Sequence, residues 1–234
     1  MTGMLYGVGV GPGDPDLITK KAVKAIERCQ VLAVPETGPS RTVALDIAKQ
    51  AADLEGKEIL SLKISMTRDP ELLRQSRDGA AQKVMDALDQ GKDVAFLTLG
   101  DPTIYSTYLY THRRVLAKGY EAQIIPGVPS FCAVAACLNE GLVENAQPLH
   151  VIPASYAGTE EALSLPGTKV LMKTGKAIGK VKEQLKQHGL YDSAKMVQNC
   201  GMENQQIHQS LDEADENASY FSILVIKDSG EEEV

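Results

Sequence analysis

The tripeptide Gly-Asp-Pro occurs twice in the chain, at residues 13–15 and 100–102. Each copy follows an apolar segment typical of a strand and precedes a segment with helical spacing. The aspartate can accept hydrogen bonds from free backbone N–H groups at a helix start, where proline gives up no needed donor. This structural role explains each motif taken singly. Because parallel α/β sheets bind ligands beyond the carboxyl ends of their strands, the two motifs together indicate a ligand site.

The first motif ends a glycine-rich loop, GVGVGPGDP, which begins at Gly7. Glycines allow a ligand or a neighbouring domain to approach the backbone closely. Neither Gly7 nor Gly9 starts the Gly-x-Gly-x-x-Gly spacing of a dinucleotide site, and Pro12 interrupts the loop. A Walker sequence with Gly-Lys-Ser/Thr after a strand is also missing, so phosphate transfer is disfavoured.

The bulk composition sets limits on the class of protein. A chain of 234 residues with 43% hydrophobic content can build one large or two small globular domains. A net charge of -7 and a pI near 5.2 disfavour a general nucleic-acid binder. The sequence has neither the roughly 20-residue apolar run of a membrane span nor a signal-peptide core. We therefore expect a soluble cytoplasmic protein without a membrane partner.

The metal-ligating residue types are scattered. The four cysteines and four histidines show no zinc spacing, and four thiols do not make a disulfide scaffold in a chain of this size. We expect reduced, mostly buried thiols and no protein-bound metal.

Alternating strand and helix patterns cover the first half of the chain. Strand patterns occupy residues 4–10, 30–34, 58–62, 93–99 and 120–125, and helical patterns occupy 17–29, 42–52, 70–90 and the stretch after residue 102 through Leu116. Such alternation predicts an N-terminal α/β domain over residues 1–126 with a mostly parallel sheet.

The second half repeats the mixture of elements. Helical patterns occupy residues 131–139 and 177–188, and strand patterns occupy 150–153, 169–173, 195–199 and 220–227. We therefore expect a C-terminal α/β domain over residues 127–234.

Three longer motifs occur in order along the chain: YGVGVGPGDPDLITKKAVKAI at residues 6–26, LGDPTIYST at 99–107 and IPGVPSFCAVAA at 125–136. Together they resemble a known family, the tetrapyrrole methylases, and the resemblance covers essentially the whole chain. The resemblance implies two α/β domains with a cofactor cleft between them, a fold unlike that of the Rossmann-type methyltransferases. It also implies a homodimer that uses S-adenosylmethionine as methyl donor.

The implied reaction is methyl transfer to carbon 20 of precorrin-2 or cobalt-factor II, a step of cobalamin synthesis. Uroporphyrinogen-III methyltransferases usually follow Gly-Asp-Pro with an arginine-containing glycine segment, whereas residues 103–108 here read TIYSTY. An electron-rich ring carbon would attack the sulfonium methyl in line, so the reaction needs alignment more than a strong acid.

The resemblance also assigns residues to the donor and to the acceptor. The implied donor contacts are Gly100, Asp101, Pro102, Tyr105, Ser106, Thr107, Pro129, Ser130, Met172, Lys173 and Gly201. The alternative interpretations are that Ser130 only caps a helix and that Met172 only packs. Many relatives carry a hydroxyl residue at position 129, where this chain has a proline.

The resemblance implies that the acceptor is a flat macrocycle with several carboxylates. The loop of Gly11, Pro12, Gly13 and Asp14 is implied to border it. An acidic protein must concentrate cations there, and the candidates are Arg41, Lys63, Arg68 and Arg74. Arg41 is the preferred contact, because a guanidinium can bind a carboxylate through two parallel hydrogen bonds whereas lysine presents a point charge. Glu36, at the end of an early strand, is the candidate general base.

Two alternatives stay open at this point. One is a methylase of the same fold acting on another ring carbon or on a different acceptor. The other is a non-catalytic adenine-nucleotide-binding α/β protein.

Overall fold

The computed structural model describes residues 1–36, 43–65, 67, 69–154, 158–215 and 218–227. It divides into two compact units, Met1–Ser130 and Phe131–Val234, which are treated separately below. The boundary expected between residues 126 and 127 falls slightly before this division. Within the described residues, no helix has the length and apolar character that a membrane crossing requires.

The first unit is built on a five-stranded sheet in which every strand pair is parallel. In the order β3-β2-β4-β1-β5, the strands are β1 (Leu5–Gly9), β2 (Val31–Glu36), β3 (Glu58–Lys63), β4 (Val94–Thr98) and β5 (Ala122–Ile125). The central strands β1 and β4 are entirely buried, as the uninterrupted apolar runs predict for a sheet covered on both faces. The parallel sheet expected from the sequence is confirmed.

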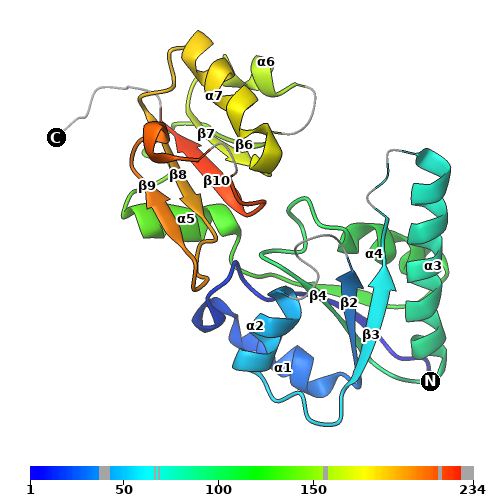
Figure 1. Ribbon diagram of the computed structural model, residues 1–234. Helices are drawn as coiled ribbons and strands as arrows, with labels where there is room; N and C mark the ends of the chain where they lie inside the picture. The colour runs from blue at the N-terminus through cyan, green and yellow to red at the C-terminus, as the bar shows by residue number, and fades with distance from the viewer. Residues whose placement is uncertain (37–42, 66, 68, 155–157, 216–217, 228–234) are drawn as a thin grey trace. The chain divides into compact units, whose positions relative to one another are not determined.

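Helices cover both faces of this sheet (Figure 1). The helices α1 (Lys20–Arg28) and α2 (Val43–Ala51) pack on one face, and α3 (Pro70–Asp89) and α4 (Tyr108–Ala117) pack on the other. Successive strand residues point to opposite faces, so Leu97 joins the core under α1 and α2 while Phe96 joins the core under α3 and α4. The helices begin where the sequence supplies caps: Thr19 accepts a hydrogen bond from Ala22 and Asp69 caps α3.

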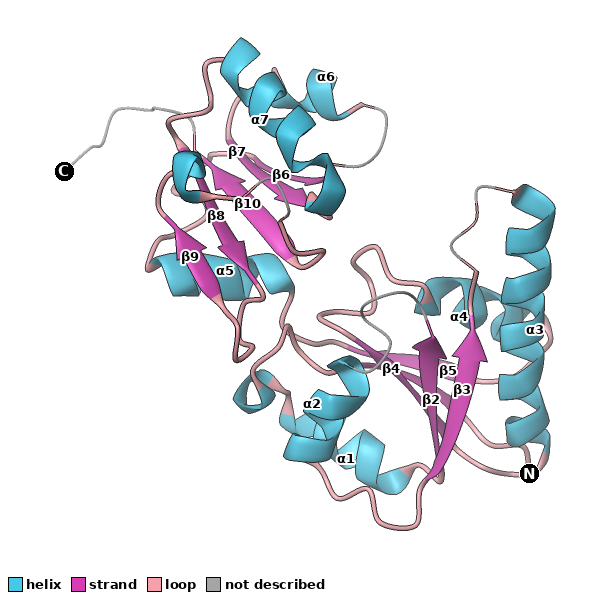
Figure 2. Cartoon of the chain, viewed as in Figure 1, coloured by secondary structure: helices cyan, strands magenta, loops and turns pink. Residues whose placement is uncertain are grey.

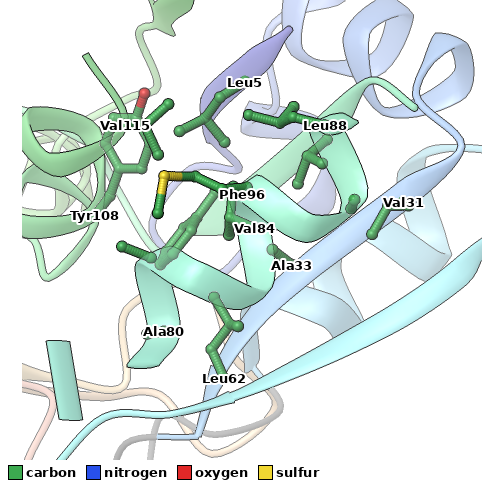
Figure 3. Close-up of a cluster of buried hydrophobic side chains, with 14 of the residues drawn as sticks. Leu5, Val31, Ala33, Leu62, Ala80, Val84, Leu88, Phe96, Tyr108 and Val115 are labelled. Atoms are coloured by element: carbon green, nitrogen blue, oxygen red, sulfur yellow. The ribbon is translucent and has the colours of Figure 1, made fainter. Parts of the chain in front are cut away.

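The core under α3 and α4 explains the first glycine of the glycine-rich loop (Figure 3). A Cβ at Gly7 would lie 2.1 Å from the Tyr108 ring, so the strand accepts that ring only because residue 7 is glycine. Tyr108 packs against Phe96 with ring centroids 5.3 Å apart. Its hydroxyl lies 2.8 Å from Nδ1 of His112 one turn along α4.

The second unit contains a mixed sheet with the order β6-β7-β10-β8-β9 (Figure 2). The strands are β6 (Leu149–Pro153), β7 (Thr168–Met172), β8 (Ala194–Gln198), β9 (Gln206–His208) and β10 (Ser222–Ile226). Strand β10 pairs antiparallel with both β7 and β8, so β7 and β8 run in the same direction. The helices α6 (Thr159–Leu163) and α7 (Ile178–Gln187) lie on one face, and α5 (Ser130–Leu138) lies on the other.

Three sequence-based expectations need correction. The short elements α6 and β9 were not foreseen, because neither is long enough to show a clear period. The helix expected directly after the second Gly-Asp-Pro begins only at Tyr108, after a stretch of turns. The first Gly-Asp-Pro likewise leads into a short 3-10 turn, Pro15–Leu17, before α1. In both places the aspartate caps a turn rather than an α-helix.

Candidate active site

Strand order indicates a candidate ligand-binding position between β1 and β4. The connection that leaves β1 runs past β4 to β2 and carries α1, whereas the connection that leaves β4 runs past β1 to β5 and carries α4 on the opposite face of the sheet. Neighbouring parallel strands whose connections leave to opposite faces favour a crevice at their carboxyl ends, where open α/β sheets bind ligands. The two loops that carry Gly-Asp-Pro begin at this edge, one after β1 and one after β4.

The two loops are joined directly to each other. Gly11 and Gly100 form an isolated bridge in which the N–H of Gly100 donates to the Gly11 carbonyl at 2.7 Å. Both glycines have positive φ, +83° and +71°, which strains any other residue. A Cβ at Gly9 or at Gly127 would lie 2.6 Å or 2.2 Å from the Gly100 carbonyl oxygen. Three chain segments therefore meet here backbone to backbone.

The side chain of Asp101 links two of these segments by hydrogen bonds. One carboxylate oxygen accepts hydrogen bonds from the backbone N–H of Thr103 at 2.7 Å and from its hydroxyl. The other accepts from the N–H of Gly127 at 3.0 Å, after β5. The side chain is buried, and a carboxylate buried among donors is favourable only while those bonds persist. Asp101 therefore holds the turn in one conformation, and its direct contact with a ligand remains a prediction.

The residues after the turn are more open. Gly100, Asp101 and Pro102 are buried, whereas Tyr105 is 46% exposed and has a positive φ of 48°. Ser106 and Thr107 are half-buried at the start of α4, as expected, and the Ser106 hydroxyl accepts the N–H of Tyr108 at 3.0 Å. A non-glycine residue in the left-handed region is typical of a functional site, because the surrounding structure must hold its backbone in this strained conformation.

A buried hydroxyl that the sequence reasoning missed lies beside this turn. Thr98 ends β4, and its Oγ1 is buried without a hydrogen-bond partner among the described residues. Buried hydroxyls are almost always paired, so this one is a candidate to bond a polar group of a ligand. The sequence signal was available, since a polar residue closes an otherwise apolar strand two positions before the glycine.

The predicted acceptor residues lie in different settings. Gly11, Pro12 and Gly13 are buried, and Asp14 accepts the N–H of Asp16 at 2.9 Å, which is its capping role. Glu36 is half-buried at the carboxyl end of β2, on the same sheet edge as the Gly11–Gly100 bridge. Arg41 and Arg68 lie outside the described residues. Among the weighed cations that are described, Lys63 ends β3 on the same edge, whereas Arg74 is engaged with Glu71 and Asp78 along α3.

The predicted donor residues of the second unit gather at one edge of its sheet. Met172 ends β7 and Gln198 ends β8, and the residue after each strand, Lys173 or Asn199, has a positive φ. Gly201, at φ +75°, donates its N–H to Oε1 of Gln205 at 2.7 Å. Because β7 and β8 are parallel to each other, these turns lie at the same sheet edge. Burial lowers the pKa of Lys173.

Pro129 and Ser130 form the connection into α5, and both are half-buried. Ser130 is the first residue of α5 rather than its cap. Its backbone N–H lies near the site, since a Cβ on Gly100 would be 3.8 Å from it. Proline at position 129 offers no N–H, so position 130 is the first donor available there.

No group of three or more metal-ligating side chains occurs in the part of the chain that the structure describes. None of the four cysteines, all of which lie in the described residues, forms a disulfide; Cys29 and Cys200 are buried, Cys137 is half-buried and Cys132 is exposed. The expectation of mostly buried thiols therefore fits only two of them.

The fold and this site define an α/β protein in which two glycine-containing turns meet at the carboxyl ends of parallel strands. Residues 4–215 match the family model of the Tetrapyrrole (Corrin/Porphyrin) Methylases, and the chain belongs to this family. It is 31% identical to a precorrin-2 C(20)-methyltransferase of a Sinorhizobium species, over 96% of this chain and 95% of that protein. It is 30% identical to the cobalt-precorrin-2 C(20)-methyltransferase of Salmonella typhimurium, over 97% of each.

Another relative is longer than this chain. The chain covers 46% of the cobalamin biosynthesis protein CobIJ of Mycobacterium tuberculosis, so it spans about half the length of that curated relative. Among solved structures, the fold matches the uroporphyrin-III C-methyltransferase of Thermus thermophilus complexed with S-adenosylhomocysteine, with a TM-score of 0.73. That match covers 97% of this chain and 98% of the other at 18% identity, which establishes a shared fold. The tetrapyrrole methylase fold expected from the motifs is confirmed.

Proposed function

We propose that this protein transfers the methyl group of S-adenosylmethionine to carbon 20 of precorrin-2 or cobalt-factor II in cobalamin synthesis. The observation that carries the proposal is the turn of Gly100, Asp101 and Pro102, which hydrogen bonds hold at the carboxyl ends of the neighbouring parallel strands β1 and β4. Family membership and the two C(20)-methyltransferase relatives support the same reaction.

The residues around the turn suit the methyl donor. S-adenosylmethionine carries hydroxyls, an adenine ring and a charged amino-acid end, and it supplies the electrophilic sulfonium methyl. The unpaired Thr98 hydroxyl can meet a polar group of such a ligand, and the exposed Tyr105 ring offers an aromatic surface. The chain itself binds and aligns the reactants, and alignment of this kind supplies about 7–11 kcal/mol in well-oriented reactions.

The same proposal assigns roles to the residues expected near the acceptor. The loop of Gly11 to Asp14 borders the macrocycle, and Arg41 binds one of its carboxylates. Glu36 takes the proton that leaves the methylated centre, and its place at the edge of the parallel sheet supports this role. In Met172, Lys173 and Gly201 the second unit supplies further donor contacts. We further propose that the protein works in the cytoplasm as a homodimer.

A methylation assay tests the proposal directly. The purified protein is incubated with methyl-labelled S-adenosylmethionine and with precorrin-2 or cobalt-factor II in separate reactions. We expect one added methyl group on one of the two acceptors, placed at carbon 20 by nuclear magnetic resonance of the product. A methyl group at another ring carbon would establish the first alternative, a methylase of different specificity, and would overturn the proposal.

A pair of matched aspartate variants tests the donor site. In Asp101→Asn the amide nitrogen replaces one acceptor oxygen, so either Gly127 or Thr103 loses its partner. Loss of a charged hydrogen bond costs about 1.5–3 kcal/mol, and we expect the affinity for S-adenosylhomocysteine to fall at least about tenfold by calorimetry. Asp53→Asn is the control, because exposed Asp53 makes the same kind of turn contact, with Glu55, away from the site.

The same calorimetry distinguishes the non-catalytic alternative. Wild-type protein is titrated with S-adenosylhomocysteine and with NAD under identical conditions. We expect binding of the former and no measurable binding of the latter, because the glycine loop lacks dinucleotide spacing. Preference for NAD, or equal affinity of the Asp101→Asn and wild-type proteins for S-adenosylhomocysteine, contradicts the proposed donor site.

A further inference from the structure

Two thiols from distant parts of the second unit touch each other. Cys137 lies in the last turn of α5, and Cys200 follows the end of β8, 63 residues further along the chain. Their sulfur atoms are 3.1 Å apart, which is hydrogen-bonding distance for two thiols. A disulfide bond is about 2.05 Å long, so a shift of roughly 1 Å, within reach of side-chain rotation, brings them to bonding distance.

The two thiols differ in accessibility. Cys200 is 6% exposed, whereas Cys137 is half-buried and reachable from solvent. The Cys137 sulfur also lies 3.5 Å from Oε1 of Gln205, the oxygen that accepts the N–H of Gly201. An oxidant therefore meets Cys137 first, and Cys200 is already placed beside it as the second thiol.

The other two cysteines lack this arrangement. Cys29 is fully buried in the first unit, and burial raises the pKa of its thiol to about 12. Cys132 is exposed on α5, and partial burial of its sulfur raises its pKa. Neither has a second sulfur within contact distance in the described part of the chain. The chain thus contains one preformed thiol pair and two built-in controls.

We propose that Cys137 and Cys200 form a reversible oxidation site that reacts with low-molecular-weight disulfides. The Cys137 thiolate attacks one sulfur of the oxidant, forms a mixed disulfide and releases the first thiol of the oxidant. The Cys200 thiolate then attacks the Cys137 sulfur and displaces the second thiol. The protein loses two protons and two electrons, which together are two hydrogen atoms, and one disulfide molecule is reduced to two thiols.

The bond would connect α5 to the turn that contains Gly201. Closing a loop of this length restricts the unfolded chain, so the oxidised second unit resists unfolding more than the reduced one. The proposal goes beyond methyl transfer and does not depend on it, because it concerns thiol chemistry that is measured without donor or acceptor.

The test uses the full-length reduced protein with excess oxidised glutathione. After quenching with an alkylating reagent, intact-mass spectrometry and a non-reducing peptide map are recorded. We expect a form that has lost two hydrogen atoms, a single cross-linked peptide pair containing Cys137 and Cys200, and full reversal by dithiothreitol. Cys29 should stay unmodified in this experiment.

Single variants complete the test. Cys132→Ser should form the cross-link as the wild type does, whereas Cys200→Ser should accumulate a stable glutathione adduct on Cys137. A stable adduct on Cys137 in the wild type, a cross-link through Cys132 or Cys29, or an unmodified pair while Cys132 reacts would each overturn the proposal. None of these outcomes bears on methyl transfer, which is tested by the assay above.

Discussion

The turns that contain the residues proposed to bind the methyl donor are built differently in the two units. In each unit these turns follow strands that run in the same direction. In the first unit the turns are made by glycines, and the backbones of Gly9, Gly100 and Gly127 approach one another without side chains. In the second unit, non-glycine residues, Lys173 and Asn199, take the left-handed position directly after the strands, and Gly201 takes it two residues after Asn199. The Asn199 side chain bonds across its turn.

The Asn199 turn shows how side chains do this work. Its Oδ1 accepts from the Ser219 hydroxyl at 2.6 Å, and its Nδ2 donates to the Asn204 carbonyl at 3.3 Å. Asparagine tolerates the left-handed conformation because its short side chain can bond locally. We therefore expect added atoms to destabilise the glycine turns of the first unit, and removed side-chain atoms to destabilise the Asn199 turn of the second unit.

The largest expected loss of stability comes from adding one methyl group to a glycine in the turns of the first unit. In Gly127→Ala the new Cβ would lie 2.2 Å from the Gly100 carbonyl oxygen, a backbone atom that cannot rotate away. We expect a loss of about 3 kcal/mol in the free energy of unfolding, at the upper end for overpacked cores. Because the chain has no tryptophan, hydrogen exchange read by mass spectrometry is the suitable measurement, and it resolves the two units separately.

Gly79→Ala is the matched control for that prediction. Gly79 lies inside α3, and a Cβ there would meet nothing within 4 Å. Alanine favours a helix interior by about 1 kcal/mol over glycine, so this variant should gain stability. If Gly127→Ala exchanged no faster than the wild type, the close backbone packing at the first site would be wrong.

The difference between the two units also explains which structural features the sequence predicts. The apolar runs and glycines of the first unit predict strands, a parallel sheet and a turn after β4, because these are local patterns. The hydrogen bond from Gly127 to Asp101 spans 26 residues and depends on how β5 is placed. No local pattern encodes that distance, so Asp101 was recognised as a cap but not as a link between loops.

The second unit was harder to predict for a related reason. Apart from β9, the sequence predicts the strand positions to within a few residues, but it does not predict the antiparallel direction of β10 between β7 and β8. A buried strand has the same apolar pattern in either direction, and the direction is decided by the connections. The bonds of Asn199 likewise join residues whose proximity only the sheet creates. Arg41 and the individual donor and acceptor contacts remain predictions.

Removing a side chain at the second site should give an intermediate effect. Asn199→Gly keeps a residue that accepts φ of 51°, but it deletes both side-chain bonds of the turn. We expect a loss of about 1 kcal/mol in the second unit, measured by hydrogen exchange of the peptides around β8 and β10. If instead the variant were as stable as the wild type, the backbone conformation alone would shape this turn.

A double-mutant cycle assigns that loss to its contact. Ser219→Ala removes the partner hydroxyl and should also destabilise the second unit. Because both substitutions break the same bond, the double variant should lose less than the sum of the two single losses. Strict additivity would show that the two residues act independently.

The smallest expected effect is a pH dependence of the stability of the first unit. In the first unit, burial, with help from the charge of Arg113, lowers the pKa of His112 below its usual value of 6.5. The unfolded chain then binds more protons than the folded one, so the stability from this group is complete above pH 6.5 and is lost as pH falls through the lowered pKa. Burial also raises the pKa of Tyr108, so its hydroxyl keeps the proton that it can donate to neutral His112.

We therefore expect the first unit to exchange faster as the pH is lowered below 6.5, after correction for intrinsic exchange rates. His112→Gln keeps a polar partner for the Tyr108 hydroxyl but does not titrate in this range, so the acid-dependent part of the opening should disappear. The second unit is the internal reference, because the substitution at His112 should leave its exchange at each pH the same as in the wild type. An equal acid response of β1 and β4 in the variant and the wild type would assign the effect to other groups, and the two cores would then not differ through His112.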